Sequence, residues 1–548
     1  MSCFNQPENS LVGAHDHDWA SDRNSHLTGE GFADFFVNVI ASYKDHTAFH
    51  YRHNGEWHSL SFSELKQTVD PLVAWFASQQ INSHSRIAIV SESRMEWPIV
   101  LFAAWLRGAI VVPLDEKMSA SELQSAIDSF RPPMIAVSPS CFKHHQDTLI
   151  GKNILVMDMH QQYDDMISLT GLAPVDEIDY HCHLRQDAIL IASTSSTSGD
   201  RKGVMLNWNN ISHQINALGS CFNVGAQNAF LSVLPLHHML ELSCGLLTVL
   251  SKGARICYLG SLLPDEILQT IQTKSVTHMV GVPMLADMLG KRMRQYESRG
   301  KAIELSLGTL IIGGAQLNSE NVTYFASHNI DLLQGYGLTE ASPVVTLNLW
   351  PKMKPDSIGQ PLPSVEVKID TADKDSKTGE ILVKGPNIML GYYNDDALSQ
   401  ATIRQGWLRT GDIGYQDQDG YVYITGRLKN IIVLTSGKNV SAEEVEACIQ
   451  TYPHVREVCV MGVQLFHNHH HGETVQICAL IVLNDDADKE RIIDEVQHRC
   501  AQLSPYKRPQ HILVYDHSLP KTATGKIKKQ LAQSIARDLI MNQSRRDH

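Results

Sequence analysis

A run of hydroxyl-bearing residues in the middle of the chain has the composition of a phosphate-binding loop. Residues 194–203 read TSSTSGDRKG, so five of the first six carry a hydroxyl group and the sixth is Gly199. Hydroxyl groups and exposed backbone N–H groups donate to phosphate oxygens, and Lys202 adds a positive charge. The run follows an apolar strand and precedes a segment that we expect to be helical, a position that favours a phosphate-binding loop over a flexible linker. It is not a Walker A loop, because the pattern GxxxxGK[ST] is absent.

The C-terminal end of the chain offers further positive charge. Residues 505–548 contain nine Lys and Arg against three Asp and Glu, a local balance of +6. Lys526 lies in this basic segment beside Gly525, whereas Lys528 and Lys529 fit a solvated basic face. Local cations of this kind can hold a small anionic substrate even though the chain as a whole is acidic.

A group of imidazoles near the C-terminus has the chemistry of a metal site. His467, His469, His470 and His471 form a cluster between two expected strands, and imidazole is a common metal ligand. We favour a solvated loop that takes up metal adventitiously, and we do not expect the functional metal site there.

Length, composition and charge exclude several classes of protein. The chain has 548 residues, 43% of them hydrophobic, which is enough for a sizeable core spread over more than one domain. The net charge of −13, from 46 Lys and Arg against 59 Asp and Glu, disfavours nucleic acid as a partner. The ten cysteines include no CxxC pair, and their wide spacing favours reduced buried thiols over disulfides or a zinc ribbon.

The sequence carries no pattern typical of a membrane span or a signal peptide. No apolar run reaches the roughly 18 residues that cross a bilayer, and the best stretch, 99–114, is interrupted by Arg107. The polar N-terminus MSCFNQPENS lacks the apolar core of a signal peptide. We expect a cytoplasmic protein with no transmembrane segment. The sequence leaves open peripheral contact with a membrane and the oligomeric state.

The elements that position these groups change in character along the chain. From about residue 33, short apolar strands alternate with helical patterns, which predicts βαβ units and largely parallel sheets. Strands are expected at 87–90, 110–113, 134–137, 188–192, 229–234, 277–282, 307–312 and 332–333. After about residue 355, short alternating strands and turns rich in Gly and Pro predict a compact β-rich subdomain.

This alternation predicts an α/β protein of two unequal domains. Residues 1–30 form a polar lead-in, and residues 31–425 form a large N-terminal domain of βαβ sheets that includes the β-rich subdomain 355–425. Residues 426–430 form a hinge, and residues 431–548 form a small α+β C-terminal domain.

The hydroxyl-rich run and four later segments share one known pattern. The run matches [ST]SGTTGxPKG at Thr194, Ser195, Thr197, Gly199, Lys202 and Gly203, with Ser198 as a conservative exchange, Ser196 in place of a glycine and Arg201 in place of a proline. The later segments are QGYGLTE at 334–340, GWLRTGD at 406–412, GRLKN at 426–430 with SGKNVSAEEVE at 436–446, and LPKTATGKIKK at 519–529. In this order they resemble the motifs of the adenylate-forming, AMP-binding superfamily. Within that superfamily, the sequence most resembles long-chain fatty acid–CoA ligases.

The resemblance implies a reaction in two half-reactions that uses ATP, Mg²⁺ and coenzyme A. A carboxylate attacks the α-phosphorus of ATP to give an acyl-adenylate and pyrophosphate, and a thiol then displaces AMP. The first step brings an anion to a polyanion, so it needs charge neutralisation and in-line positioning.

Four residues receive catalytic roles from the resemblance. Lys526 reaches the carboxylate and the α-phosphate and stabilises the adenylation transition state. Thr339 contacts the α-phosphate, and Glu340 binds Mg²⁺, for which a carboxylate and phosphate oxygens are suitable ligands. His238 matches a histidine near the thioester path.

The resemblance also implies a nucleotide-binding set. Tyr336 stacks on adenine, Asp412 accepts hydrogen bonds from the ribose hydroxyls, and Arg427 faces the ribose or the phosphates. The complete ATP- and AMP-binding set comprises Thr194, Ser195, Ser196, Thr197, Ser198, Gly199, Lys202, Gly314, Ala315, Gly335, Tyr336, Gly337, Thr339, Asp412, Arg427 and Lys526.

The hinge has a named residue in this pattern. Lys429 takes the position about which the mobile C-terminal domain rotates between adenylation and thioester formation. After rotation Lys526 leaves the site, and Gly437, Lys438 and Asn439 line the path of coenzyme A.

The segment expected to border the acyl group is apolar. Residues 234–250 read LPLHHMLELSCGLLTVL, in which Glu241 is the only charged residue. An amino-acid-activating domain usually offers an Asp here, so its absence favours an uncharged acyl tail. The PLHHxxE form and the stretch GVMLNWNNI resemble long-chain acyl-CoA synthetases, which favours a medium- to long-chain fatty acid.

Two alternatives remain beside the acyl-CoA ligase. A fatty acyl-AMP ligase would pass the acyl group to the phosphopantetheine of an acyl carrier protein, which would be a separate chain. A non-catalytic acyl or nucleotide sensor would be expected to lack Lys526, Glu340 or Asp412, and all three are present.

Overall fold

The computed structural model describes most of the chain, with short gaps between the described segments. These segments are residues 29–163, 167–175, 178–181, 187–195, 201–222, 224–301, 304–314, 319–349, 352–354, 356–371, 376–435, 438–466, 473–484, 488–521 and 527–546. The α-helices are α1 (Phe32–Tyr43), α2 (Phe62–Ser78), α3 (Glu96–Leu106), α4 (Ala120–Phe130), α5 (Pro139–His144), α6 (Gln146–Leu149), α7 (Trp208–Cys221), α8 (Thr248–Ser251), α9 (Pro264–Thr273), α10 (Pro283–Ser298), α11 (Ser319–Ser327), α12 (Asp396–Thr402), α13 (Ala442–Gln450), α14 (Lys489–Cys500) and α15 (Lys529–Arg546). No described helix combines the length and the apolar character that crossing a membrane requires.

A nine-stranded sheet forms one half of the large domain. Its strands, in spatial order, are β16 (Gln360–Pro361), β15 (Val344–Asn348), β14 (Asp331–Gly337), β13 (Thr309–Gly313), β12 (His278–Gly281), β10 (Ala229–Ser232), β11 (Arg255–Tyr258), β1 (Thr47–His53) and β2 (Glu56–Ser61). The pairs from β14 to β1 are parallel, whereas β2, β15 and β16 join antiparallel at the two edges.

An eight-stranded sheet forms the other half. Its order is β19 (Gly391–Tyr392), β9 (Arg201–Asn207), β8 (Ala188–Ser195), β4 (Ile110–Leu114), β3 (Arg86–Val90), β5 (Met134–Val137), β6 (Ile154–Val156) and β7 (Ile167–Ser168). The pairs from β8 to β7 are parallel, and β9 and β19 join antiparallel.

The expectation that the hydroxyl-rich run precedes a helix is wrong. The run connects β8 to a second strand, β9, which pairs with it so that Thr194 lies opposite Lys202, and helix α7 begins only at Trp208. The cause lies in the apolar alternation of β9, in which Val204 packs into the core between the two large sheets while Met205 packs on the opposite face. Residues buried on alternate faces make a strand. The two ends of the run therefore belong to an antiparallel pair of strands.

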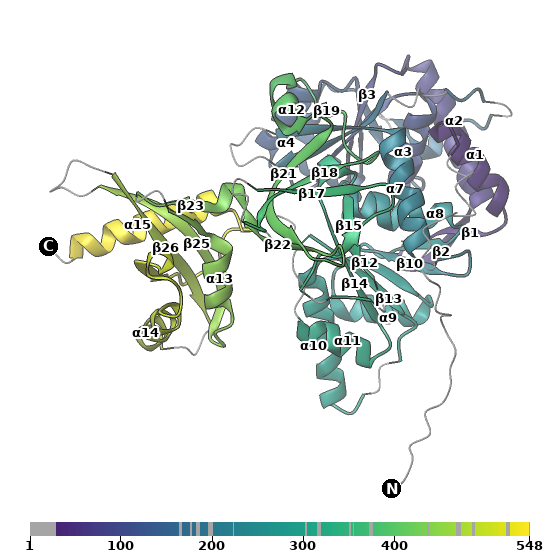
Figure 1. Ribbon diagram of the computed structural model, residues 1–548. Coiled ribbons are helices and arrows are strands. Elements are labelled where there is room, and N and C mark those ends of the chain that lie inside the picture. The colour runs from purple at the N-terminus through teal and green to yellow at the C-terminus, as the bar shows by residue number, and fades with distance from the viewer. Residues whose placement is uncertain are drawn as a thin grey trace, which may run out of the picture.

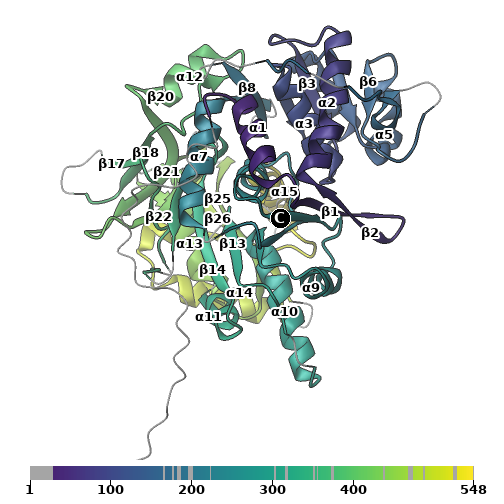
Figure 2. The same ribbon diagram turned by 90° about the vertical axis from the view of Figure 1, so that its right-hand side faces the viewer.

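Alternating burial shows how the layers are stacked. In β10, Phe230 packs with α1, α2 and α3 between the two sheets, whereas Leu231 packs with α9, α10 and α11 on the outer face. In β3, Ile87 faces the same inner layer and Ala88 faces α4 and α5. Helix α3 lies in the inner layer with all of its residues buried. The body therefore has helices on both faces of each sheet, with one helical layer shared (Figures 1 and 2).

A smaller β-sheet and a C-terminal domain complete the structure. The five-stranded sheet contains β17 (Glu366–Asp370), β18 (Gly379–Lys384), β21 (Trp407–Gln416), β20 (Ile403–Arg404) and β22 (Val422–Arg427). The C-terminal domain contains β23 (Ile431–Val433), β24 (Asn439–Ser441), β25 (Val455–Phe466), β26 (Glu473–Leu483) and β27 (His511–Val514). Figure 1 shows this domain in green to yellow beside the body, next to β22.

The structure confirms the predicted α/β fold with a large N-terminal and a smaller C-terminal domain. The predicted domain boundaries remain a prediction. Strand β22 ends at Arg427, so it runs through the expected start of the hinge at residue 426. Two short strands within the range 355–425, β16 and β19, pair with the two large sheets rather than with the five-stranded sheet. These pairings attach the β-rich region to the body.

Candidate active site

The pairing of β21 with β22 brings Asp412 and Arg427 together. The two residues lie opposite each other in the antiparallel register, and Arg427 Nε lies 2.8 Å from Asp412 Oδ1. The Asp412 side chain is only 5% exposed, whereas Arg427 is 43% exposed. The carboxylate is therefore held inside the protein, while the guanidinium beside it stays accessible to a ligand.

Tyr336 holds the second oxygen of Asp412. It lies near the end of β14, is buried, and donates its hydroxyl to Asp412 Oδ2 at 2.6 Å. Burial, followed by the negative charge of Asp412, raises the pKa of Tyr336 well above its usual value, so the phenol stays protonated and remains a donor. Tyr336 and Asp412, which are predicted to bind adenine and ribose, are thus in direct contact with each other.

Glu340 lies in a second group, which includes the lysine of the hydroxyl-rich run. Tyr392 donates its hydroxyl to Glu340 Oε1 at 2.9 Å, and Lys202 Nζ lies 5.4 Å from the centre of the Tyr392 ring. Tyr392 can make both contacts because β19 pairs with β9, where Tyr392 lies opposite Val204. Burial and the Glu340 carboxylate raise the pKa of Tyr392.

The hinge lysine lies close to both groups. Partial removal from water lowers the pKa of Lys429, and repulsion from Arg427 and Lys202 lowers it further, while Asp412 and Glu340 oppose this effect. All four neighbours are predicted nucleotide-site residues. Lys429, predicted only as a hinge residue, is therefore also part of the electrostatic environment of the site.

Glycines border the same region. A Cβ atom on Gly337 would lie 1.8 Å from the carbonyl oxygen of Pro343, so no other residue fits between β14 and the following loop. Gly314 has a φ of +94°, which favours glycine, and a Cβ on Gly313 would meet Leu240 at 2.9 Å. Gly335 lies beside Leu347 in the adjacent strand. Three of these glycines therefore allow close packing within the protein, whereas a Cβ on Gly314 would meet no described atom within 4 Å.

The segment predicted to border the acyl group folds as a π-helix. Residues Glu241–Leu247 form this element, η3, and every one of its side chains is buried. Burial raises the pKa of Glu241 to about 8, although the Ser232 hydroxyl, 2.5 Å from Oε1, favours the charged form. Glu241, the only residue of the segment that would ordinarily be charged at pH 7, is therefore neutral near that pH. His238 lies one turn before η3 and donates its backbone N–H to the carbonyl oxygen of Pro235.

Other predicted residues lie elsewhere or outside the described segments. Thr339 begins the short 3₁₀ helix η4 (Thr339–Ala341) next to Glu340. Lys438 Nζ lies 4.3 Å from the centre of the Tyr506 ring, within the C-terminal domain, and Asn439 begins β24. The backbone of Ser195 ends β8. The residues outside the described segments are Ser196, Thr197, Ser198, Gly199, Ala315, Gly437, Lys526 and the histidines His467, His469, His470 and His471.

Sequence reasoning did not select Tyr392, although it contacts two predicted site residues. The local sequence Gly391-Tyr392-Tyr393-Asn394 offers an aromatic pair beside turn-forming residues, which is common in surface loops. Its position depends on the pairing of β19 with β9, which no local pattern indicates.

The residues around Glu340 are compatible with a magnesium ion at that position. Glu340 belongs to no group of three potential metal ligands among the described residues, so Mg²⁺ at this position would take its remaining ligands from phosphate oxygens and water. That ligand set is the one Mg²⁺ favours in nucleotide sites, and the residues present fit it.

Comparison with known proteins gives consistent matches over most of the chain. Residues 36–393 match the family described as AMP-binding enzyme, and residues 444–526 match the AMP-binding enzyme C-terminal domain. The chain is 28% identical over 506 residues to the indoleacetate–CoA ligase of Aromatoleum aromaticum, covering 88% of this chain and 95% of that protein. It is 27% identical over 536 residues to the medium-chain fatty-acid–CoA ligase of Escherichia coli, covering 93% of this chain and 91% of that protein.

Solved structures show the same fold. The crystal structure of ATP-bound MatB from Rhodopseudomonas palustris superimposes with a TM-score of 0.79 at 24% sequence identity, covering 92% of this chain and 99% of that chain. The first family match alone spans more than half of the 548 residues. The resemblance inferred from the sequence motifs is confirmed, and the chain belongs to the family of AMP-binding enzymes.

Proposed function

We propose that this protein is an AMP-forming acid–CoA ligase whose substrate is a medium- to long-chain fatty acid. The observation that carries the proposal is the contact between Tyr336, Asp412 and Arg427, together with the neighbouring group of Glu340, Tyr392 and Lys202. These groups offer acceptors for a sugar diol and cations for phosphates in one place. The relatives that cover most of the chain are CoA ligases.

In the first half-reaction, a carboxylate oxygen of the fatty acid bonds to the α-phosphorus of ATP. The bond from that phosphorus to the bridging oxygen breaks, and pyrophosphate leaves. Asp412 would fix the ribose, Arg427 and Lys202 would offset phosphate charge, and Lys526 would stabilise the charge of the transition state. Glu340 would hold Mg²⁺, which neutralises phosphate charge when it is bound.

In the second half-reaction, the sulfur of coenzyme A bonds to the acyl carbon as the thiol loses its proton and AMP leaves. This step would follow rotation of the C-terminal domain about Lys429, which removes Lys526 from the site. Gly437, Lys438 and Asn439 would line the path of coenzyme A, and His238 would lie near the thioester. Close to the proposed hinge in the sequence, Ile424, Leu428 and Val433 have exposed apolar side chains, which another orientation of the domain would cover.

The acyl group is proposed to be uncharged along its length. The segment 234–250 is apolar, and Glu241 is neutral near pH 7 because its pKa is raised to about 8. A charged or zwitterionic acid would find no opposite charge from this segment. The E. coli relative named for medium-chain fatty acids favours an aliphatic tail, whereas the relative named for indoleacetate favours an aromatic acid as the second candidate.

Two other functions make different predictions. A fatty acyl-AMP ligase would form acyl-AMP but transfer the acyl group to a separate acyl carrier protein rather than to coenzyme A. A sensor would bind the acid or the nucleotide without releasing pyrophosphate. The presence of Glu340, Asp412 and Lys526 argues for catalysis.

A panel of acids tests these functions. The full-length protein is supplied with ATP, Mg²⁺ and acetate, octanoate, palmitate, benzoate or indoleacetate, with and without coenzyme A, and pyrophosphate and acyl-CoA are measured. We expect pyrophosphate with octanoate or palmitate, and acyl-CoA only when coenzyme A is present. Pyrophosphate without acyl-CoA would favour the carrier-protein ligase, preference for indoleacetate would favour an aromatic substrate, and no pyrophosphate with any acid would contradict the enzyme.

The variant Lys526→Ala is the matched control for this panel. We expect it to release no pyrophosphate but to form the thioester from supplied acyl-AMP, because Lys526 would act in the first half-reaction alone. Normal pyrophosphate release by this variant would contradict the role of Lys526.

A further inference from the structure

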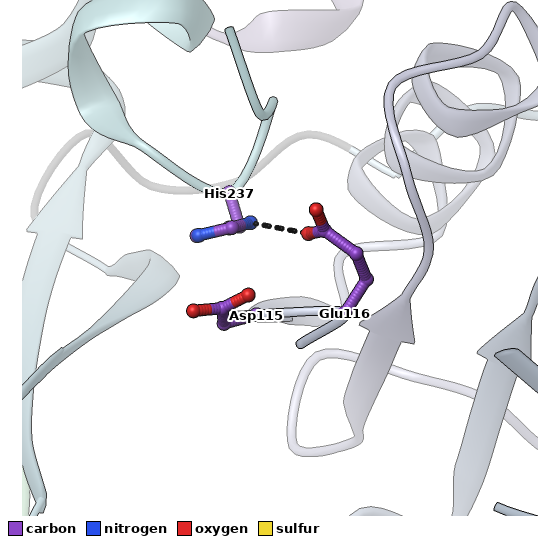
Figure 3. Close-up of side chains that lie close together, drawn as sticks. All are labelled: Asp115, Glu116 and His237. Atoms are coloured by element: carbon purple, nitrogen blue, oxygen red, sulfur yellow. Dashed lines mark ion pairs between the residues drawn. The ribbon is translucent and has the colours of Figure 1, made fainter. Parts of the chain in front are cut away.

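A second group of metal-binding side chains lies away from Glu340. Asp115 and Glu116 directly follow strand β4 of the eight-stranded sheet, and His237 follows strand β10 of the nine-stranded sheet. One ligand atom from each of the three side chains lies within 4.8 Å of the others. Figure 3 shows the His237 ring above Asp115 and beside the Glu116 carboxylate, with Nδ1 directed at Glu116.

Three polar atoms of this group are buried without a hydrogen bond to any residue that the structure describes. The His237 side chain is only 7% exposed, and neither of its ring nitrogens makes a hydrogen bond within the described part of the chain. Glu116 Oε2 is likewise buried without a hydrogen bond, although it lies 3.3 Å from His237 Nδ1. A buried polar atom without a partner costs roughly 1–3 kcal/mol, so His237 Nδ1 and Glu116 Oε2, which face each other, are an unfavourable pair. A cation between them would give both atoms a partner.

The carboxylate of Asp115 is held in place by the backbone. Its Oδ1 accepts a hydrogen bond from the backbone N–H of Lys117 at 2.9 Å, which fixes the orientation of the carboxylate. Metal ligands in proteins are commonly oriented by such neighbouring groups. Lys117 Nζ pairs with Glu116 Oε1 at a long distance of 3.9 Å, and the Lys117 side chain is 57% exposed, so this ion pair is open to water.

We propose that Asp115, Glu116 and His237 bind one divalent transition-metal ion of the Zn²⁺ type. One imidazole and two carboxylates are ligands that suit Zn²⁺, Co²⁺ or Mn²⁺ better than Mg²⁺, because imidazole is not a preferred ligand of Mg²⁺. Zinc lies about 2.0–2.2 Å from nitrogen and oxygen ligands, so the ligand atoms around one ion are about 3–4.4 Å apart. The three side chains need only a small inward movement from their present separation to reach that geometry.

The ion would join the two halves of the large domain. The segment 115–116 extends from one large sheet, and the segment around His237 extends from the other. Ser93 already links the same two halves, since its hydroxyl donates to the carbonyl oxygen of Leu234 at 2.7 Å and accepts the backbone N–H of Leu236. His238 follows His237 directly, and the two rings lie 4.2 Å apart, so the ion would also fix the start of the segment proposed to border the acyl group.

This site is distinct from the magnesium site of the proposed function and does not depend on it. Glu340 is not among the three ligands, and no step of the ligase reaction needs the second ion. A binding measurement without ATP or fatty acid therefore tests the site even if the proposed activity fails.

The test is the number of Zn²⁺ ions that the full chain binds tightly after treatment with a chelator. Wild-type protein, His237→Gln and Asp115→Asn are titrated with Zn²⁺ against a competing indicator, in excess Mg²⁺. We expect each variant to bind one tight ion fewer than wild type, or to bind that ion at least about tenfold more weakly, because even loss of a group that merely supports a ligand costs that much. Co²⁺ should give visible absorption bands in the wild type that are reduced in both variants.

A matched control separates this site from other histidines. His328→Gln removes a histidine whose Nε2 pairs with Glu297 at 2.6 Å, far along the sequence from the three ligands, and should bind as many ions as wild type. Ions held by His467 and its neighbours would contribute equally to all four proteins. Equal number and affinity of ions in wild type and His237→Gln would overturn the proposal, and so would a wild type that binds no Zn²⁺. If circular dichroism shows that His237→Gln does not fold, Asp115→Asn decides the outcome in the same way.

Discussion

The nucleotide side of the candidate site and the segment proposed to border the acyl group differ in how their ionisable groups are satisfied. On the nucleotide side, Asp412 is bound by both Tyr336 and Arg427, and Glu340 is bound by Tyr392. On the acyl side, Glu241 is fully buried with one hydroxyl contact from Ser232, and it remains neutral near pH 7.

The ionisable groups of the two regions differ because each region is proposed to bind a different part of the substrates. Charged groups that are paired with one another are held in position without losing charge, which suits the binding of a sugar and phosphates. A carboxyl group that burial keeps neutral adds no charge to an apolar wall. The two regions are neighbours in the fold. Leu240 packs against Gly313 of β13, and Gly313 lies opposite Gly335 of β14.

The largest expected effect tests the nucleotide side. Asp412→Ala removes the acceptor proposed for the ribose and leaves the Tyr336 hydroxyl and Arg427 without their shared partner. Hydrogen bonds to charged groups contribute about 1.5–3 kcal/mol each, so we expect pyrophosphate release to fall by roughly 10²- to 10³-fold. The measurement is the initial rate of pyrophosphate release at saturating fatty acid, with ATP varied.

Asp419→Ala is the control for this variant. Asp419 belongs to the turn between β21 and β22, is 73% exposed and pairs with Lys354, so its loss removes a surface charge from the same hairpin. We expect near-normal activity for Asp419→Ala. If Asp412→Ala retains wild-type activity while its thermal midpoint falls, Asp412 has a structural role alone and the contrast between the two regions loses its functional meaning.

A smaller effect is expected on the acyl side, and it depends on pH. The pKa of Glu241 is about 8 in the folded protein and near 4.5 in the unfolded chain, so the folded state holds a proton that the unfolded state loses. The contribution of this group to stability is therefore fully present below about pH 4.5 and is lost as the pH rises toward 8. Glu241→Gln carries no such proton and should be more stable than wild type at pH 7, by about 3 kcal/mol.

Thermal unfolding at pH 5 and pH 7 measures this effect. We expect the midpoint difference between Glu241→Gln and wild type to be larger at pH 7 than at pH 5. Glu320→Gln, which changes a side chain that is 76% exposed, should show no such change with pH. A Glu241→Gln variant that is less stable than wild type at pH 7 would mean that Glu241 is charged in the folded protein, and the contrast with Asp412 would disappear.

The same two regions differ in how far the sequence predicts them. Asp412, Tyr336 and Glu340 lie in short contiguous motifs, and Tyr336, near the end of β14, meets Asp412, within β21, through a hydrogen bond. The strand alternation also predicted the α/β fold, since buried strands and helices leave clear periods in the sequence.

The unpredicted features depend on pairing between distant segments. The hydroxyl-rich run was expected before a helix, but β9 follows it because both faces of Gly203-Val204-Met205 are buried, and a short buried run does not separate strand from helix. The π-helix η3 is buried on every side, so its apolar sequence has no polar face that would reveal its period. Tyr392 enters the site only because β19 pairs with β9.

The smallest expected effect concerns this unpredicted tyrosine. Tyr392→Phe keeps the ring beside Lys202 and removes only the hydroxyl that donates to Glu340 Oε1. A single hydrogen bond to a carboxylate contributes about 1.5–3 kcal/mol, and only the part that orients Glu340 affects the rate, so we expect pyrophosphate release to fall by about two- to tenfold. Because Glu340 is proposed to bind Mg²⁺, the concentration of Mg²⁺ at half-maximal rate should rise. Tyr393→Phe, which removes a neighbouring hydroxyl, is the matched control and should leave that concentration unchanged. A loss of rate in Tyr392→Phe with no change in the Mg²⁺ dependence would show that the hydroxyl supports the strand pairing rather than the orientation of Glu340, and the nucleotide side would then rely on fewer oriented charges than the contacts suggest.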